Sequence, residues 1–185
     1  MTLLEQPMQT PEYSVIAFSD DRLEEEISRR LTLDARADED PVLTLIIGPI
    51  CSGKTTIRRK KFSHGSVLVD AAQLFIDLGG TDLDFPSSLE NPMELIGTAV
   101  SSRAVNGRMN IVTELIGAEI GPVRELIDAM GSVGYRINIV GVNAELSACL
   151  EREESRAQDN VSACYAEQFQ MKWLLAAAGG FKLDA

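Results

Sequence analysis

The chain has 185 residues, of which 45% are hydrophobic and 24% charged, proportions typical of one soluble globular domain. Its formal net charge of −11 argues against long nucleic acid as a partner, because nucleic-acid-binding proteins carry a basic surface. Three cysteines at unrelated spacings predict neither a disulfide framework nor a zinc site, and the lack of a basic leader and of a long apolar run predicts a cytoplasmic protein without a membrane span.

The first regular element that the sequence predicts is a helix near the N-terminus. Apolar residues recur at every fourth position from Leu23 to Leu31, which indicates a helix from Asp21 to about Leu33. Asp21 and Glu24 have the spacing of a capping box, so we expect the helix to begin there. A charged linker is expected after it.

From Val42 onward, short apolar segments alternate with amphipathic ones. Strands are predicted over Val42–Ile47, Ser66–Val69, Met109–Thr113 and Tyr135–Val142, with a short fifth over Phe181–Leu183. Helices are predicted over Lys54–Phe62, Ala71–Leu78 and Asn91–Asn106, from Pro122 to just before Gly134, from an Asn143 cap to about Arg156, and over Ser162–Ala178. This alternation predicts an α/β fold with a parallel sheet of about five strands and helices on both faces. We expect residues 1–40 to form an N-terminal lead-in with a helix, and residues 41–185 to form the α/β domain.

The segment between the first strand and the following helix has the P-loop pattern Gly-x4-Gly-Lys-Thr. Gly48 and Gly53 allow the backbone to turn successive N–H groups toward an anion at a helix N-terminus. Lys54 supplies a cation for the outer phosphates, and the Thr55 hydroxyl is a suitable magnesium ligand. The pattern therefore predicts a site for ATP with Mg²⁺. This site comprises Gly48, Pro49, Ile50, Cys51, Ser52, Gly53, Lys54, Thr55 and Thr56. Cys51 is either a small residue that the loop tolerates or a thiol activated by the helix N-terminus.

Two carboxylates follow predicted strands, at the edge of the sheet where ligands bind. Asp70 is either a general base for an acceptor hydroxyl or a cap of the helix that begins at Ala71. Glu114 is expected beside Thr55, where it would hold magnesium through water or contact substrate; the alternative is a strand-end residue in solvent. The neighbouring P-loop favours the functional interpretation of both carboxylates.

Arg152 and Arg156 are four residues apart on a predicted helix and therefore share one face. They precede a polar stretch that would let a lid close, so they are candidates for neutralising charge on the transferring phosphoryl group. The alternative is that they pair with the glutamates around them, Glu151, Glu153 and Glu154. His64 is expected at the surface.

This order of elements resembles the zeta-toxin family of P-loop kinases from about Leu43 to Arg156. The residues that match the family are Lys54, Thr55, Asp70, Glu114, Gly134, Tyr135, Arg152 and Arg156. The resemblance implies a kinase that transfers the γ-phosphate of ATP to a hydroxyl of a small molecule, such as the sugar nucleotide UDP-N-acetylglucosamine. It also implies that Asp70 is the base and that an antitoxin-like protein is a partner.

Two positions depart from the family pattern. Zeta toxins place Thr two residues after the strand-end Glu and Arg two residues beyond that, whereas this chain has Ile116 and Ala118. The loss of a hydroxyl and a guanidinium removes charge-assisted contacts to a sugar nucleotide, although nucleotide binding is unaffected. A nucleoside or a polynucleotide 5′ end stays open as acceptor. The alternative function is a catalytically weak nucleotide-binding module with a regulatory or interaction role.

Overall fold

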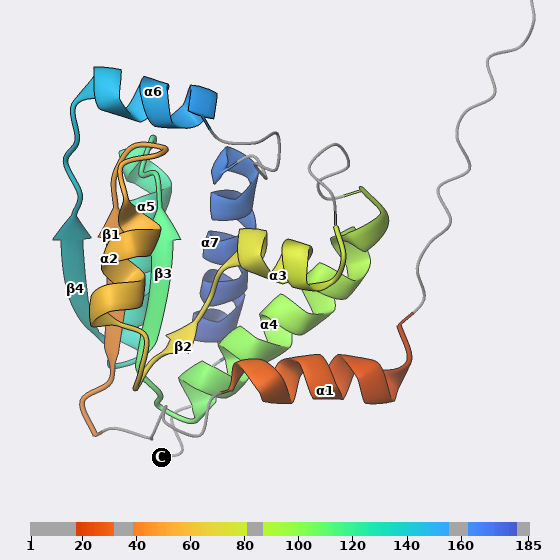
Figure 1. Ribbon diagram of the computed structural model, residues 1–185. Coiled ribbons are helices and arrows are strands. Elements are labelled where there is room, and N and C mark those ends of the chain that lie inside the picture. The colour runs from red at the N-terminus through yellow and green to blue at the C-terminus, as the bar shows by residue number, and fades with distance from the viewer. Residues whose placement is uncertain (1–17, 32–38, 81–86, 156–162, 181–185) are drawn as a thin grey trace, which may run out of the picture.

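The computed structural model describes residues 18–31, 39–80, 87–155 and 163–180. Its strands are β1 (Val42–Ile47), β2 (Val67–Leu68), β3 (Ile111–Leu115) and β4 (Arg136–Gly141). Its helices are α1 (Asp20–Arg30), α2 (Lys54–Lys61), α3 (Ala71–Asp77), the 3-10 turn η2 (Ser87–Leu89), α4 (Glu90–Asn106), α5 (Ile120–Ser132), α6 (Leu146–Ser155) and α7 (Ala163–Gly180). The predicted α/β class is confirmed (Figure 1).

The four strands form one parallel sheet in the order β2-β3-β1-β4. The P-loop strand β1 is therefore central: Leu43 pairs with Ile111 on one side and with Ile137 on the other. Because all strands run in one direction, their carboxyl ends lie at one edge of the sheet, and α6 lies across this edge (Figure 1). The predicted fifth strand falls on residues outside the described ranges.

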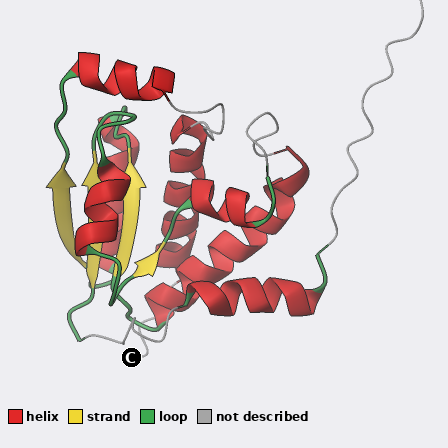
Figure 2. Ribbon diagram, in the orientation of Figure 1, coloured by secondary structure: helices red, strands yellow, loops and turns green. Residues whose placement is uncertain are grey.

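Helices cover both faces of the sheet, as predicted, because side chains alternate between the faces along each strand. Helix α2 covers one face, where Ile46 and Val112 form a small apolar cluster with Val142. The other face carries the main core, which includes Leu43, Leu45 and side chains from α1, α3, α4, α5 and α7. Figure 2 shows α2 in front of the strands and α5 behind them. Among the helices of the described ranges, none has the length and apolar character that a membrane crossing needs.

The predicted start of α1 is wrong. The helix begins at Asp20, because the Oγ of Ser19 accepts a hydrogen bond from the N–H of Arg22 at 3.3 Å and caps the first turn. Glu24 makes no capping box and instead pairs with Arg103 of α4, at 2.6 Å. The helix also ends earlier than the predicted Leu33: its last residue is Arg30, and Leu31 is the C-cap.

Several other boundaries differ from the prediction by a few residues. Strand β3 extends to Leu115, because its parallel pairing with β1 continues to that residue, so Glu114 lies within the strand rather than after it. Helix α6 begins at Leu146 and not directly after Asn143. Helix α7 continues through Gly179 and Gly180, which we expected to lie beyond its end.

Candidate nucleotide-binding and active site

The P-loop connects β1 to α2, and its two glycines are required by the backbone geometry. A Cβ atom on Gly48 would lie 2.4 Å from the carbonyl oxygen of Val142, a backbone atom that cannot move aside easily. Gly53 has φ +97° and Cys51 has φ +58°, so the loop passes twice through the left-handed region. Turns of this kind direct successive N–H groups into one concavity that suits an anion.

The loop residues fit the triphosphate that the sequence predicts. The Ser52 side chain is buried, and its Oγ has no hydrogen-bond partner among the described residues. The N-terminus of α2 has no side-chain cap, so the N–H groups of its first turn lack an acceptor from that source. Phosphate oxygens would satisfy both sets of donors. The Lys54 ammonium donates to the carbonyl oxygens of Gly48 and Pro49, at 2.7 and 2.8 Å, and so lies over the loop.

Glu114 lies where the sequence places it, beside Thr55. One oxygen of its carboxylate accepts from Thr55 Oγ1 at 2.8 Å, and the other accepts from Arg58 Nε at 2.5 Å. The Arg58 and Glu114 side chains are only 10% and 11% exposed, so this ion pair is largely withdrawn from water. That Thr55 and Glu114 bind a metal remains a prediction.

Sequence reasoning missed Arg58 as a site residue because it begins a run of four basic residues. The available signal is its spacing from Thr55: residues three apart share a helix face, and Thr55 is predicted to face the phosphates. Within the described ranges, no group of three His, Cys, Asp or Glu side chains gathers to hold a metal. Magnesium commonly completes its coordination with substrate phosphates and water, so Thr55 and Glu114 would be sufficient as protein ligands.

Asp70 faces the same side of the sheet as Glu114. Leu68 pairs with Val112, and Asp70 and Glu114 each lie two residues further along, so the alternation of side chains turns both toward α2. The capping role of Asp70 is real, because its Oδ1 accepts from the N–H of Gln73 at 3.0 Å. A role as base is compatible with this cap, since one carboxylate oxygen can accept several hydrogen bonds.

The pKa of the Asp70 carboxyl is raised above its ordinary value, and burial is the largest cause. The hydrogen bond from the Gln73 N–H opposes this rise, the nearby Glu114 carboxylate adds to it, and Arg58 opposes it. A carboxylate with a raised pKa is a stronger base than one with an ordinary pKa, which suits proton abstraction.

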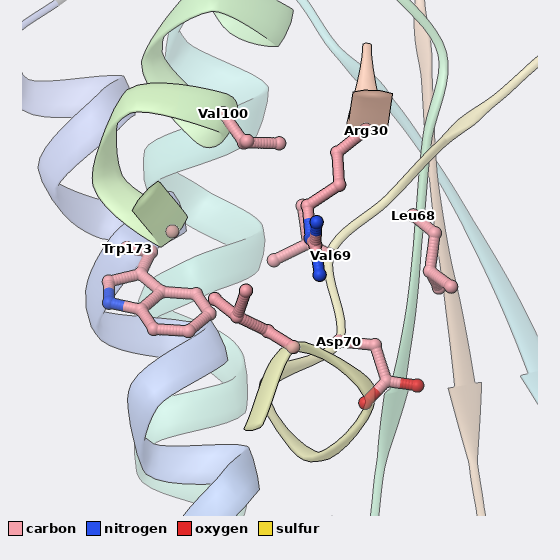
Figure 3. Close-up of a pocket in the computed structure, with 8 residues that line it drawn as sticks. Arg30, Leu68, Val69, Asp70, Val100 and Trp173 are labelled. Carbon is pink, nitrogen blue, oxygen red and sulfur yellow. The ribbon is translucent and has the colours of Figure 1, made fainter. Parts of the chain in front are cut away.

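A small cavity of about 20 Å³, enough for one water molecule, lies on the side of Asp70 that is opposite to α2. Its lining residues are Arg30, Leu68, Val69, Asp70, Leu74, Gly97, Val100 and Trp173. Figure 3 shows the Asp70 carboxylate directed away from Trp173. The cavity is far smaller than a substrate pocket. An acceptor would therefore approach Asp70 from the side of α2.

Of the two arginines that the sequence predicts on a lid, the structure describes Arg152 but not Arg156. Arg152 of α6 donates from Nη1 to the carbonyl oxygen of Cys51 at 3.1 Å, so the structure brings it to the P-loop. Arg156 lies outside the described residues. Cys51 is buried, which favours its interpretation as a small residue that the loop tolerates. His64 is exposed, as expected.

The loop that follows β3 contains the two positions that depart from the zeta-toxin pattern. Ile116 is half-buried and Ala118 is exposed, and the backbone N–H groups of Ile116 and Gly117 both donate to Glu167 of α7. Glu167 is a further residue that sequence reasoning missed. Its signal is a carboxylate in the second turn of a helix that is mostly apolar.

Comparison with known proteins gives a likeness of fold. No protein-family model matches the chain, and no curated protein matches it in sequence. A chain from the PezAT chromosomal toxin–antitoxin system of Streptococcus pneumoniae superimposes with a TM-score of 0.56 and 18% identity, over 76% of this chain. This likeness shows that the two chains share a fold. A chain from the Pnkp1/Rnl/Hen1 RNA repair complex superimposes with a TM-score of 0.51 and 15% identity, over 82% of this chain. The match spans 65% and 49% of the length of these two chains, respectively.

Proposed function

We propose that this protein is a P-loop phosphotransferase that binds ATP with Mg²⁺ and transfers the γ-phosphate to a hydroxyl of a small molecule. The observation that carries the proposal is the convergence of three features on one side of the sheet. These features are a P-loop whose Ser52 hydroxyl has no partner among the described residues, a Thr55–Glu114 pair beside it, and the half-buried carboxylate of Asp70 one strand away.

Each residue has a distinct part in this proposal. The amides of the P-loop, Ser52 Oγ and Lys54 hold the phosphates, while Thr55 and Glu114 hold the metal. The metal supplies charge neutralisation on the phosphate oxygens when it is bound. Asp70 accepts the proton of the acceptor hydroxyl as the oxygen attacks the γ-phosphorus, the bond from this phosphorus to the β,γ-bridging oxygen breaks, and ADP leaves. The raised pKa of Asp70 favours the proton transfer. Arg152, already at the P-loop, neutralises charge that develops during transfer, and Arg156 is a candidate for the same role.

The acceptor is proposed as a small alcohol. A sugar nucleotide belongs to this class, although Ile116 and Ala118 cannot supply the contacts that zeta toxins use for it. By analogy with the fold neighbour from a toxin–antitoxin system, we include an antitoxin-like protein among the proposed partners. We place the protein in the cytoplasm, where ATP is abundant.

A catalytically weak nucleotide-binding module is the second candidate. It is favoured by the same apolar substitutions, and by the fact that both Glu114 oxygens are already bonded to protein groups. The two candidates agree on nucleotide binding and differ on transfer. Transfer is therefore the measurement that separates them.

The test combines ATP titration with a transfer assay that uses labelled ATP, magnesium and a panel of alcohols, sugar nucleotides and nucleosides. We expect Lys54→Ala to abolish saturable ATP binding. Asp70→Asn should keep ATP affinity and lower transfer by about 10²–10⁴-fold, the usual contribution of a general base. Asp77→Asn is the matched control, because this more exposed carboxylate lies at the far end of the same helix. Saturable ATP binding without transfer to any acceptor would favour the binding module, and failure to bind ATP would refute both candidates.

A further inference from the structure

Two polar side chains are buried on one face of α7. Glu167 is 7% exposed and Gln170 is 2% exposed, and residues three apart share a helix face. The other fully buried side chains nearby on this helix are apolar, namely Trp173 and Leu174. Burying a carboxylate and an amide costs stability unless hydrogen bonds compensate, so the partners of these groups reveal why they are there.

Glu167 holds the loop that follows β3. Its two oxygens accept from the backbone N–H groups of Ile116 and Gly117, each at 3.0 Å. Glu114 lies only two residues before Ile116 in the sequence. The carboxylate of Glu167 therefore fixes the backbone directly after the proposed metal ligand.

Gln170 joins the two strand ends that carry the proposed functional carboxylates. In the amide orientation that its neighbours require, its nitrogen donates to the carbonyl oxygen of Glu114 at 3.1 Å. Its oxygen accepts from the N–H of Ala71 at 3.2 Å, and Ala71 directly follows Asp70. One side chain thus bridges the backbones beside Asp70 and at Glu114.

Backbone pairing within the sheet constrains the distance between Asp70 and Glu114 only weakly. Strand β2 has two residues, and its pairing with β3 covers Val67 and Leu68. In the described residues, the last backbone bond of this ladder runs from the N–H of Val69 to the carbonyl oxygen of Val112, at 3.0 Å. Gln170 supplies a side-chain bridge just beyond the point where the ladder ends.

We propose that Glu167 and Gln170 are positioning residues that fix the spacing between Asp70 and Glu114. The inference rests on the proposed phosphotransferase function. Neither side chain is placed to contact the phosphates, because all four bonds go to backbone atoms. An apolar pair would pack equally well against the core, so the choice of polar groups points to the strand ends. A displacement of one carboxylate relative to the other would slow transfer, because reacting groups must be held within a fraction of an ångström.

The principal test compares Gln170→Leu with Leu174→Ala. The first variant removes both bridging bonds and replaces the amide by an apolar side chain of similar size. The second perturbs the next turn of α7 and removes no hydrogen bond to either strand end. At a temperature where both are folded, we expect Gln170→Leu to lower kcat by about 10–100-fold, the usual effect of a residue that orients a functional group. KM for ATP should stay unchanged, because the P-loop is intact, and Leu174→Ala should retain the parent kcat.

A second measurement does not depend on transfer. Carbon NMR of the Asp70 carboxyl should show its titration midpoint moving down, toward that of a free aspartate, in Gln170→Leu, because a loosened strand end admits water. The Ala71 amide should lose protection against hydrogen exchange in the same variant. If the parent protein transfers no phosphoryl group, the proposed function fails, whereas these two readouts still decide whether Gln170 fixes the strand ends.

If Gln170→Leu does not fold, Glu167→Gln provides a milder change, because its amide keeps one acceptor for the two loop N–H groups. We then expect one of the Ile116 and Gly117 amides to lose protection and kcat to fall. The inference is overturned if kcat, the Asp70 titration and the amide protection all remain at parent values in the folded variant. It is also overturned if Leu174→Ala reproduces the loss of kcat, since general loosening of α7 would then explain the effect.

Discussion

Replacing Asp70 by asparagine separates the two roles of this side chain, as a helix cap and as a half-buried carboxylate. The amide oxygen of asparagine can accept the hydrogen bond from the N–H of Gln73, now at 3.0 Å, and Asn and Asp are equally good N-cap residues. The substitution therefore keeps the cap and removes only the charge. Asp70→Ala removes both, and loss of the cap alone costs about 1 kcal/mol.

The raised pKa of Asp70 sets the sign of the pH dependence. At a pH well below its ordinary pKa of 3.8, Asp70 is protonated in both the folded and the unfolded chain, so its titration does not change the free energy of unfolding. As the pH rises past that value, the unfolded chain loses this proton first, so the folded chain binds more protons and its stability falls. The loss is complete once the pH exceeds the folded pKa. Titration of Asp70 thus makes the fold less stable at neutral pH than at acid pH.

We therefore expect Asp70→Asn to be at least as stable as the parent at neutral pH while it loses transfer. Urea denaturation from acid to neutral pH should show its advantage over the parent growing with pH, and Asp70→Ala should be about 1 kcal/mol less stable than Asp70→Asn throughout. Asp77→Asn should change stability by at most about 1 kcal/mol, as is usual for exposed ion pairs. Equal destabilisation of Asp70→Asn and Asp70→Ala at neutral pH would refute the reasoning, because the charge would then be favourably paired.

Three further substitutions test the packing around the site. Gly97→Ala should destabilise the protein by about 1–3 kcal/mol, because the new Cβ would lie 2.3 Å from the Trp173 ring; its control, Gly131→Ala, has nothing within 4 Å and should be neutral or stabilising in thermal unfolding. Tyr135→Phe should cost about 1 kcal/mol in urea denaturation, because the buried hydroxyl donates to the Met109 carbonyl oxygen at 2.8 Å. Gly48→Ala should abolish ATP binding in titrations, because the backbone around the loop leaves no space for a Cβ; unchanged affinity would show that the loop can adopt another conformation.

The sequence predicts the elements well where local chemistry decides them. The bounds of β1 match the apolar run from Val42 to Ile47, because a strand buried on both faces leaves a distinct signal. The cap of α1 was misassigned because Ser19, Asp20 and Asp21 are all suitable N-cap residues. A local pattern cannot rank such equivalent candidates. The pairing of Glu24 with Arg103, which takes Glu24 from a capping box, depends on a helix distant in the sequence.

The sequence predicts the separate residues of the candidate site, but it does not predict the contacts between segments that are distant in the chain. The P-loop pattern, Asp70 and Glu114 can each be read from residues next to them in the chain. Arg58 becomes a partner of Glu114 only when β3 lies beside β1 and under α2. Gln170 bridges Glu114 and Ala71, so its position depends on three segments that meet only in the folded protein.

The two bonds on Glu114 have a consequence for the order of loading. A free divalent ion at this carboxylate must displace the hydrogen bonds from the Thr55 hydroxyl and the Arg58 guanidinium, and it supplies no new acceptor for these donors. An ion carried by a nucleotide arrives with phosphate oxygens, which give the displaced donors new acceptors. We therefore expect the protein to bind magnesium as a complex with the nucleotide and to have little affinity for free magnesium.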